Sequence, residues 1–273
     1  MRRIAHISDL HFFLTDPTVV EALAAELNAD PPDLIAVSGD LTMRARSREF
    51  RAARAFFDRL RAPTLAVPGN HDITSHWLHE RFLDPLGRWR RFIAEEPEPV
   101  WADGEVAVVG VNTTSRAGAF LDWSQGRVGE GRLRRAVDRL RALPDDLFRV
   151  VVAHHPFLPP ESAPDTRLVG RAEAALAAFD AQGVRMVLSG HLHLGYMRAR
   201  GAAQGAEAAG GAAGPGGGDG ELLVVQAATA TSTRLRGEPN AYNRIRIEGG
   251  RATVEVRAWD GRGWTTGTAA EAP

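Results

Sequence analysis

Short apolar segments alternate with segments of helical periodicity over the first 190 residues or so. The apolar segments are four to six residues long and carry few polar side chains, which is typical of strands covered on both faces. They span residues 3–8, 34–38, 64–67, 106–111, 148–153 and 185–189. Between them, the spacing of apolar residues predicts helices over 17–28, 47–61, 77–93, 130–143 and 171–182. This alternation predicts an α/β fold.

The pattern changes after about residue 195. Residues 201–220 contain nine Gly and seven Ala and cannot bury enough surface to offset their ordering entropy, so we expect a mobile loop at 199–220. Strand patterns resume at 221–227, and residues 240–248 and 252–259 alternate around Gly249 and Gly250, which predicts a hairpin. With 267–273 expected to be a disordered tail, residues 1–266 are predicted to form one domain.

The composition excludes several kinds of chemistry. The chain has 273 residues, 44% of them hydrophobic and 25% charged, as in ordinary globular proteins. All 33 basic residues are Arg, so Schiff-base chemistry and a phosphate-loop lysine are ruled out. The absence of Cys rules out disulfides, thiolate catalysis, iron–sulfur clusters and Cys-ligated zinc. A bound metal would therefore need Asp, Glu, Asn or some of the nine His.

Charge and hydropathy bear on which partners the protein binds and where it is located. The net charge is −1, which disfavours a strongly electrostatic nucleic-acid binder, and we expect no stable nucleic-acid complex. No apolar run approaches the length of a membrane span, and the N-terminus lacks the apolar stretch of a signal peptide. We therefore expect no membrane association and a cytoplasmic location.

Residues of metal-ligand type directly follow five of the six predicted strands. They are Asp9 and His11, then Asp40, then Asn70, His71 and Asp72, then His154 and His155, and finally His191 and His193. Ligands of open α/β sheets bind beyond the carboxyl ends of the strands. The sequence therefore predicts one site at this edge, containing six of the nine His.

The residue types suit hard to borderline divalent ions such as Mn²⁺, Fe²⁺ and Zn²⁺. In Asp9-x-His11 and His191-x-His193, extended backbone would point both side chains the same way, about 7 Å apart, toward one ion or a pair. Glycines at positions 39, 69 and 190 are expected to let the backbone turn sharply. A bridging Asp40 would fit two ions about 3.5–4 Å apart, which clamp the oxygens of an in-line phosphoryl displacement.

Each motif alone is weak evidence. A single His beside a strand end is more often a structural hydrogen-bonding residue than a ligand, and Gly69-Asn70-His71-Asp72 alone is also a turn sequence. Their ordered recurrence at successive predicted strand ends is what favours a common site.

In this order and combination, the motifs resemble those of the calcineurin-like metallophosphoesterases. The resemblance covers residues 4 to about 194 and implies a four-layer α/β/β/α sandwich with a dinuclear metal site at the strand ends. The ligands that it implies form two sets sharing one carboxylate: Asp9, His11, Asp40 and His193 for one ion, and Asp40, Asn70, His154 and His191 for the other. It implies two divalent ions as cofactors, and their identity as Mn, Fe or Zn stays open.

The resemblance also implies roles for the third motif. In the family, the His at position 71 faces the substrate and stabilises the transition state or protonates the leaving group. Asp72 would either orient His71 or be structural.

Three further residues have two interpretations each. The family ligand stands two residues before the Pro of its motif, which selects His154, so His155 lies either behind the ligands or toward the substrate. Arg116 and Arg44 are each a candidate for contact with a phosphate oxygen or an ordinary surface arginine.

The predicted activity is phosphodiester hydrolysis by a hydroxide bridging the two ions. Residues 39–42 together with 69–72 resemble the bacterial phosphodiesterases near the class III cyclic-nucleotide enzymes, so the expected substrate is a small phosphoester such as a cyclic nucleotide. The alternatives are a phosphomonoesterase or nucleotide pyrophosphatase, and more remotely a non-catalytic scaffold, which would require a lost ligand. The oligomeric state stays open, with a dimer as one option.

Overall fold

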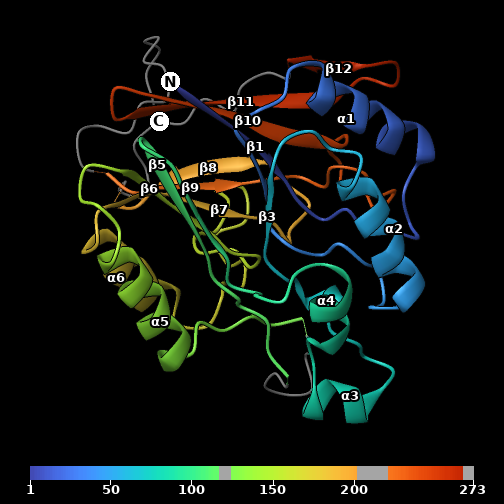
Figure 1. Cartoon of the computed structure of the whole chain (residues 1–273), viewed down its shortest axis with the longest axis horizontal. Helices are drawn as coiled ribbons and strands as arrows, with labels where there is room; N and C mark the ends of the chain where they lie inside the picture. Colours follow the sequence, from blue (N-terminus) through green and yellow to red (C-terminus); the bar gives the residue numbers. More distant parts are fainter. Residues whose placement is uncertain (117–123, 202–220, 267–273) are drawn as a thin grey trace.

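Two six-stranded sheets packed face to face form the centre of the structure (Figure 1). The computed structural model describes residues 1–116, 124–201 and 221–266. Helices cover the outer faces of both sheets, with α1 (Pro17–Ala29) and α2 (Ser47–Phe57) on one side and α5 (Glu130–Arg141) and α6 (Ala172–Asp180) on the other. The predicted α/β/β/α sandwich is therefore confirmed.

The first sheet combines a parallel and an antiparallel half in the order β12-β11-β10-β1-β2-β3. Its strands are β1 (Arg2–Ile7), β2 (Leu34–Val37), β3 (Thr64–Ala66), β10 (Ala241–Glu248), β11 (Arg251–Trp259) and β12 (Trp264–Thr266). β1 is parallel to β2 and antiparallel to β10, so the N-terminal strand lies between the two halves.

The second sheet has the order β4-β5-β6-β7-β9-β8, with the four central strands parallel. Its strands are β4 (Val100–Ala102), β5 (Val106–Gly110), β6 (Phe148–Val152), β7 (Val184–Ser189), β8 (Tyr196–Ala199) and β9 (Leu223–Gln226). Parallel neighbours bring the carboxyl ends of successive strands to one edge.

Buried side chains on both faces explain why the predicted strands are apolar throughout. In β1, Ile4 packs between the sheets, whereas Ala5 and Ile7 pack against the layer of α1 and α2. In β6, Val150 lies between the sheets and Val151 faces α5 and α6. Each central strand thus supplies two apolar layers, since successive residues point to opposite faces.

Local chemistry accounts for several element boundaries. Asp16 caps α1 by accepting a hydrogen bond from the Thr18 N–H, with Pro17 in the first turn. Gly249 and Gly250 have φ of 55° and 75°, and the β10–β11 hairpin that they close confirms the prediction.

Other elements differ from the predictions. The helix expected over 77–93 is wrong, because it is interrupted around Pro85 into α3 (Leu78–Leu83) and α4 (Gly87–Phe92). Proline lacks an N–H and disfavours helical backbone in the residue before it. The helix expected over 47–61 ends at Phe57, and the short strands β4, β8 and β12 were not predicted.

Two expectations concern the segments rich in small residues. β8 extends to Ala199, so the loop expected at 199–220 starts later than predicted. Residues 202–220 of that loop, and the tail expected at 267–273, lie outside the described residues. Within the described ranges, no helix is both long and apolar enough to cross a membrane.

Candidate metal centre

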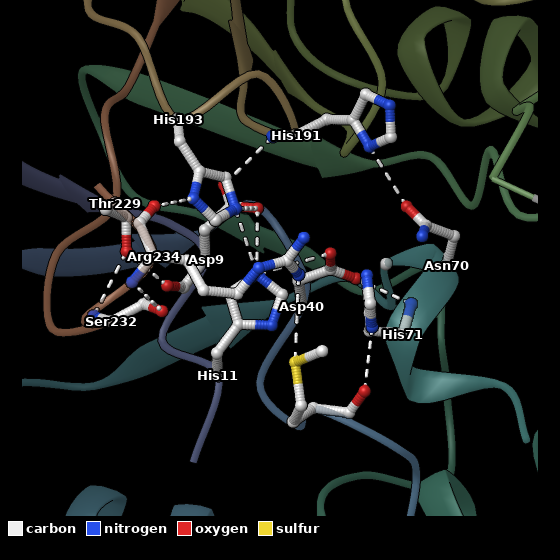
Figure 2. Close-up of polar contacts among 12 residues, drawn as sticks. Asp9, His11, Asp40, Asn70, His71, His191, His193, Thr229, Ser232 and Arg234 are labelled. Atoms are coloured by element: carbon white, nitrogen blue, oxygen red, sulfur yellow. Dashed lines mark hydrogen bonds and ion pairs between the residues drawn. The ribbon is translucent and has the colours of Figure 1, made fainter. Parts of the chain in front are cut away.

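Five strand ends converge on one cluster of His, Asp and Asn side chains (Figure 2). Asp9 and His11 follow β1, Asp40 follows β2, Asn70 and His71 lie in the single turn η1 (Asn70–Asp72) after β3, His154 follows β6, and His191 and His193 follow β7. The side chains predicted to share a site are therefore together, although their segments are up to 184 residues apart along the chain (9 to 193).

One group of donor atoms lies around His11. Its Nε2 is 3.0 Å from Nε2 of His193 and 3.7 Å from carboxylate oxygens of both Asp9 and Asp40. The same Asp9 oxygen, Oδ1, is 3.3 Å from His193 Nε2. These four residues are the set expected for the first ion.

A second group lies around Asn70. Its Oδ1 is 3.0 Å from His154 Nε2 and 3.0 Å from His191 Nδ1, and these two ring nitrogens are 3.3 Å apart. Asp40 Oδ2 is 3.4 Å from His154 Nε2 and 3.7 Å from His11 Nε2. One carboxylate oxygen therefore borders both groups, which is the geometry that a bridging ligand requires.

Backbone carbonyls determine which nitrogen of three imidazoles faces the cluster. A carbonyl oxygen only accepts, so the ring nitrogen beside it must carry the proton. The pairs are His11 Nδ1 with Thr42 O at 3.3 Å, His154 Nδ1 with Ser38 O at 2.7 Å, and His193 Nδ1 with Arg234 O at 2.8 Å. In all three rings the Nε2 lone pair is left for a cation, as in other metal sites.

The carboxylate of Asp9 leaves one oxygen for a cation. Its Oδ2 accepts hydrogen bonds from the Ser8 hydroxyl at 2.6 Å and from the His191 N–H at 2.9 Å. Its Oδ1 is buried and has no hydrogen-bond donor among the described residues. A buried carboxylate oxygen without a donor is unfavourable, and a bound cation would satisfy it.

The electrostatics of the cluster also demand positive charge. Burial alone would lower the pKa of His154, but the carboxylates of Asp40 and Asp9 outweigh it and raise that pKa to about 9. Burial alone would raise the pKa of Asp40, but His154 and His71 hold it well below its ordinary value. The donor set therefore consists of two ionised carboxylates and several imidazoles, which fits a pair of divalent cations.

The backbone at the ligands is left-handed, so the extended conformation expected for Asp9-x-His11 and His191-x-His193 is wrong. The values of φ are 52° at Asp9, 47° at His11, 51° at Asp40, 77° at His191 and 59° at His193. Such conformations cost on the order of 1–3 kcal/mol each for non-glycine residues and persist where the surroundings impose them. Here the Asp9 and His11 N–H groups donate to the carbonyls of Gly39 and Asp40.

The glycines at positions 39, 69 and 190 serve different purposes. Gly39 has φ of +90°, so its expected role in a sharp turn is correct. Gly69 and Gly190 do not have positive φ, so left-handed backbone is not the reason for glycine at these two positions. A Cβ at Gly69 would overlap the Asp40 carboxylate, and one at Gly190 would overlap the Ser8 hydroxyl, so both positions need space rather than backbone freedom.

His71 is attached to the cluster through its backbone. Its N–H donates to Asp40 Oδ1 at 2.8 Å, and its ring lies edge-on to that of His11 with centroids 4.9 Å apart. Its Nδ1 donates to the Met43 carbonyl at 2.7 Å. Nε2 has no hydrogen-bond partner among the described residues.

The Asp72 carboxylate accepts hydrogen bonds from backbone N–H groups and not from the His71 ring. Its carboxylate accepts from the N–H groups of Gly69, Leu41 and Thr42 at 2.9–3.2 Å and from the Thr42 hydroxyl at 3.0 Å. Burial and the neighbouring Asp40 raise its pKa to about 7, while these donors act in the opposite direction. Of the two predicted roles, the geometry corresponds to the structural one, and the catalytic role predicted for Asp72 is not supported by it.

His155 lies within ligand distance of His154 and His191, but both of its nitrogens have protein partners. Nε2 donates to the Ser124 carbonyl at 2.9 Å, and Nδ1 accepts from the Thr113 hydroxyl at 2.7 Å. Burial, with the neighbouring His154, holds its pKa well below the ordinary value. Of the two alternatives, the position behind the ligands is the one observed.

The two candidate arginines occupy different surroundings. Arg116 is exposed, donates to the Phe82 carbonyl at 3.1 Å and lines a hollow that contains none of the metal donors. Arg44 is exposed and follows Met43, whose carbonyl holds His71. It lines a 590 Å³ hollow with the side chains of Arg46, His76, Trp77 and Arg88. Neither hollow is lined by a metal donor or by His71, so Arg44 is linked to the site only as the chain neighbour of Met43.

A further segment, residues 228–234 after β9, was missed by the sequence reasoning. The hydroxyls of Thr229 and Thr231 donate to the carbonyls of Asp9 and Leu10 at 2.6 and 2.8 Å. Figure 2 shows Thr229, Ser232 and Arg234 beside the donors. The sequence did contain evidence for this segment, because the strand predicted at 221–227 ends at the same sheet edge as the strands that carry the ligands.

Comparisons with known proteins concern the family and the fold of this chain. A family model described as "Calcineurin-like phosphoesterase" matches residues 2–195. A "Probable cyclic nucleotide phosphodiesterase" of Synechococcus sp. is 26% identical over 223 residues, which are 72% of this chain and 76% of the relative. The glycerophosphodiester phosphodiesterase GpdQ of Enterobacter lignolyticus is 35% identical over 94 residues, 30% of this chain and 33% of the relative.

The fold also resembles a solved structure. A dimetal phosphatase from Danio rerio superposes with a TM-score of 0.63 at 12% identity, covering 94% of this chain and 96% of that one. At this identity the likeness concerns the fold alone.

Proposed function

The chain belongs to the calcineurin-like phosphoesterase family, a family of phosphoester hydrolases, and from this premise we propose that it is a dinuclear-metal phosphodiesterase. Cyclic nucleotides are the leading substrate class. The observation that carries the proposal is the Asp40 carboxylate, one oxygen of which lies 3.7 Å from His11 Nε2 in one donor group and 3.4 Å from His154 Nε2 in the other.

The residues that would hold the ions follow from the donor atoms that face the cluster. Asp9 Oδ1 and the Nε2 atoms of His11 and His193 would serve one ion, Asn70 Oδ1 with His154 Nε2 and His191 Nδ1 the other, and Asp40 both. When bound, two divalent ions make water nucleophilic near neutral pH and neutralise charge on the phosphoryl oxygens. The buried orphan oxygen of Asp9 supports this assignment.

His71 would act on the leaving group. Its Nδ1 proton is engaged by the Met43 carbonyl, so a proton for the leaving oxygen would come from Nε2 of the imidazolium form. The hydrogen bond from its N–H to Asp40 Oδ1 fixes this imidazole relative to the bridging carboxylate. A displacement of Asp40 would therefore also displace the proton donor.

The comparisons support diesters over monoesters, because the two curated relatives are both named as phosphodiesterases. The name of the Synechococcus relative supports cyclic nucleotides.

A substrate panel tests the substrate class. The Mn²⁺-reconstituted protein would be assayed on cyclic nucleotides, linear diesters, monoesters and dinucleotides, and we expect the highest kcat/KM on diesters. A clear preference for monoesters or anhydrides would contradict the proposal in favour of a phosphomonoesterase or nucleotide pyrophosphatase.

Substitution of the bridging carboxylate tests the dinuclear centre. We expect Asp40→Asn to lose at least about 100-fold in kcat, since the shared negative charge is removed, and to retain fewer than two ions per chain. Metal analysis and turnover would be measured on the same samples. Asp58→Asn, at the exposed end of α2, is the matched control and should behave as wild type.

Undiminished turnover in Asp40→Asn would contradict the dinuclear mechanism. A wild-type protein that holds two ions but hydrolyses no phosphoester would favour the scaffold alternative.

A further inference from the structure

Arg234 is anchored to the metal centre by its main chain. Its carbonyl accepts the Nδ1 proton of His193 at 2.8 Å, and its N–H donates to the Ser232 hydroxyl oxygen at 3.1 Å. The start of the Arg234 side chain is therefore fixed beside a predicted ligand of the first ion.

The side chain of Arg234 runs from this anchor toward the proposed proton donor. Figure 2 draws it toward the centre of the cluster. Its Nη1 lies 3.7 Å from Met43 Sδ, and the carbonyl of the same Met43 holds His71 at 2.7 Å. Arg234 therefore extends from His193, which its carbonyl contacts, to Met43, whose carbonyl contacts His71.

The Arg234 guanidinium has few hydrogen-bond partners in the described part of the protein. It is half-buried, and among the described residues its hydrogen bonds go only to the Met43 thioether, which is a weak acceptor. No carboxylate within the described part of the chain forms an ion pair with it. A partly desolvated cation without an anionic partner is unfavourable, so this position is suited to an anion that arrives with the substrate.

We propose that the Arg234 guanidinium binds a non-bridging oxygen of the substrate's phosphoryl group. The planar fork of guanidinium donors matches phosphate oxygens, and a cation between His193 and His71 is placed to stabilise the charge that develops during displacement. This inference rests on the proposed function and adds to it a residue that contacts the substrate. It concerns the side chain only, because the hydrogen bond to His193 uses the main chain.

Arg234→Met and Arg234→Lys separate the two parts of the residue. Both keep the carbonyl that holds His193, so we expect the metal content to stay at the wild-type level. Calorimetric affinity for inorganic phosphate and kcat/KM on bis(4-nitrophenyl) phosphate should each fall about 10- to 100-fold in Arg234→Met, as for loss of a charge-assisted hydrogen bond. Arg234→Lys should recover part of both. Arg236→Met, on the same loop and exposed, is the matched control.

Each result has a defined meaning. Unchanged phosphate affinity and kcat/KM in a fully metallated Arg234→Met protein would overturn the inference, and so would loss of metal from both variants, which would assign a structural role. If the wild-type protein hydrolyses no diester but Arg234→Met still weakens phosphate binding, the proposed function fails and this inference stands.

Discussion

At the scale of the residue, the centre depends on main-chain atoms as much as on ligand side chains. Carbonyls of Thr42, Ser38 and Arg234 orient three imidazoles, and the Met43 carbonyl orients His71. Every residue has a carbonyl, so the residue type at these positions does not show that its carbonyl orients an imidazole. The side-chain positions were predictable from ordered motifs, whereas the groups that orient them depend on the fold.

Gly190 illustrates how little space the ligands leave. We expect Gly190→Ala to lower the free energy of unfolding by about 1–3 kcal/mol, because its Cβ would overlap Ser8 and lie 2.6 Å from Asp9 Oδ2. Chemical denaturation and metal analysis would measure the two consequences, loss of stability and weaker metal retention. Gly195→Ala, where the nearest atom to an added Cβ is 3.6 Å away, should be close to wild type. Equal stability of the two variants would argue against the close packing.

At the scale of the element, the central strands and the edge strand β3 were predictable, whereas the other three edge strands were not. β2 and β6 are buried at every position, so their apolar runs appear in the sequence. β4, β8 and β12 are three or four residues long and lie at the ends of the two sheets. Such strands are defined by pairing with a neighbour rather than by their own composition, so single-sequence patterns do not reveal them.

Asp72 joins two elements, η1 and the segment between β2 and α2. We expect Asp72→Asn to cost about 1–3 kcal/mol of stability, because the amide has one accepting oxygen and would leave buried N–H groups of Leu41 and Gly69 unpaired. Urea denaturation would measure this cost, with Asp58→Asn as the exposed control. A variant of wild-type stability whose activity alone is lost would instead support the catalytic role.

At the scale of the whole molecule, His6 makes stability depend on pH. Its Nε2 bonds to Ser38 Oγ at 2.9 Å and its Nδ1 accepts from Asn243 at 3.2 Å, so the buried ring is neutral. Burial lowers its pKa from 6.5 to about 3, against an opposing effect of Asp9. Between these values the unfolded chain takes up a proton that the folded chain does not, so stability falls as the pH falls below 6.5.

The size of this effect can be tested by substitution. At about 1.4 kcal/mol per pH unit, the contribution lost by pH 5 is about 2 kcal/mol. We expect His6→Gln to lack this part of the pH dependence, measured by urea denaturation at pH 7 and pH 5 in the presence of a chelator. His79→Gln, at an exposed position, should keep the wild-type slope. An unchanged slope in His6→Gln would show that the ring is protonated in the folded state.

The position of β1 between β2 and β10 has a consequence for biosynthesis. During synthesis, the hydroxyls of Thr229 and Thr231 that hold the segment of Asp9 and His11, and the strand β10 that pairs with β1, emerge more than 200 residues after that segment. A nascent chain that has reached His193 contains every predicted metal ligand but lacks these supports. The centre is therefore completed late in synthesis, by a part of the chain beyond the residues that identify the family.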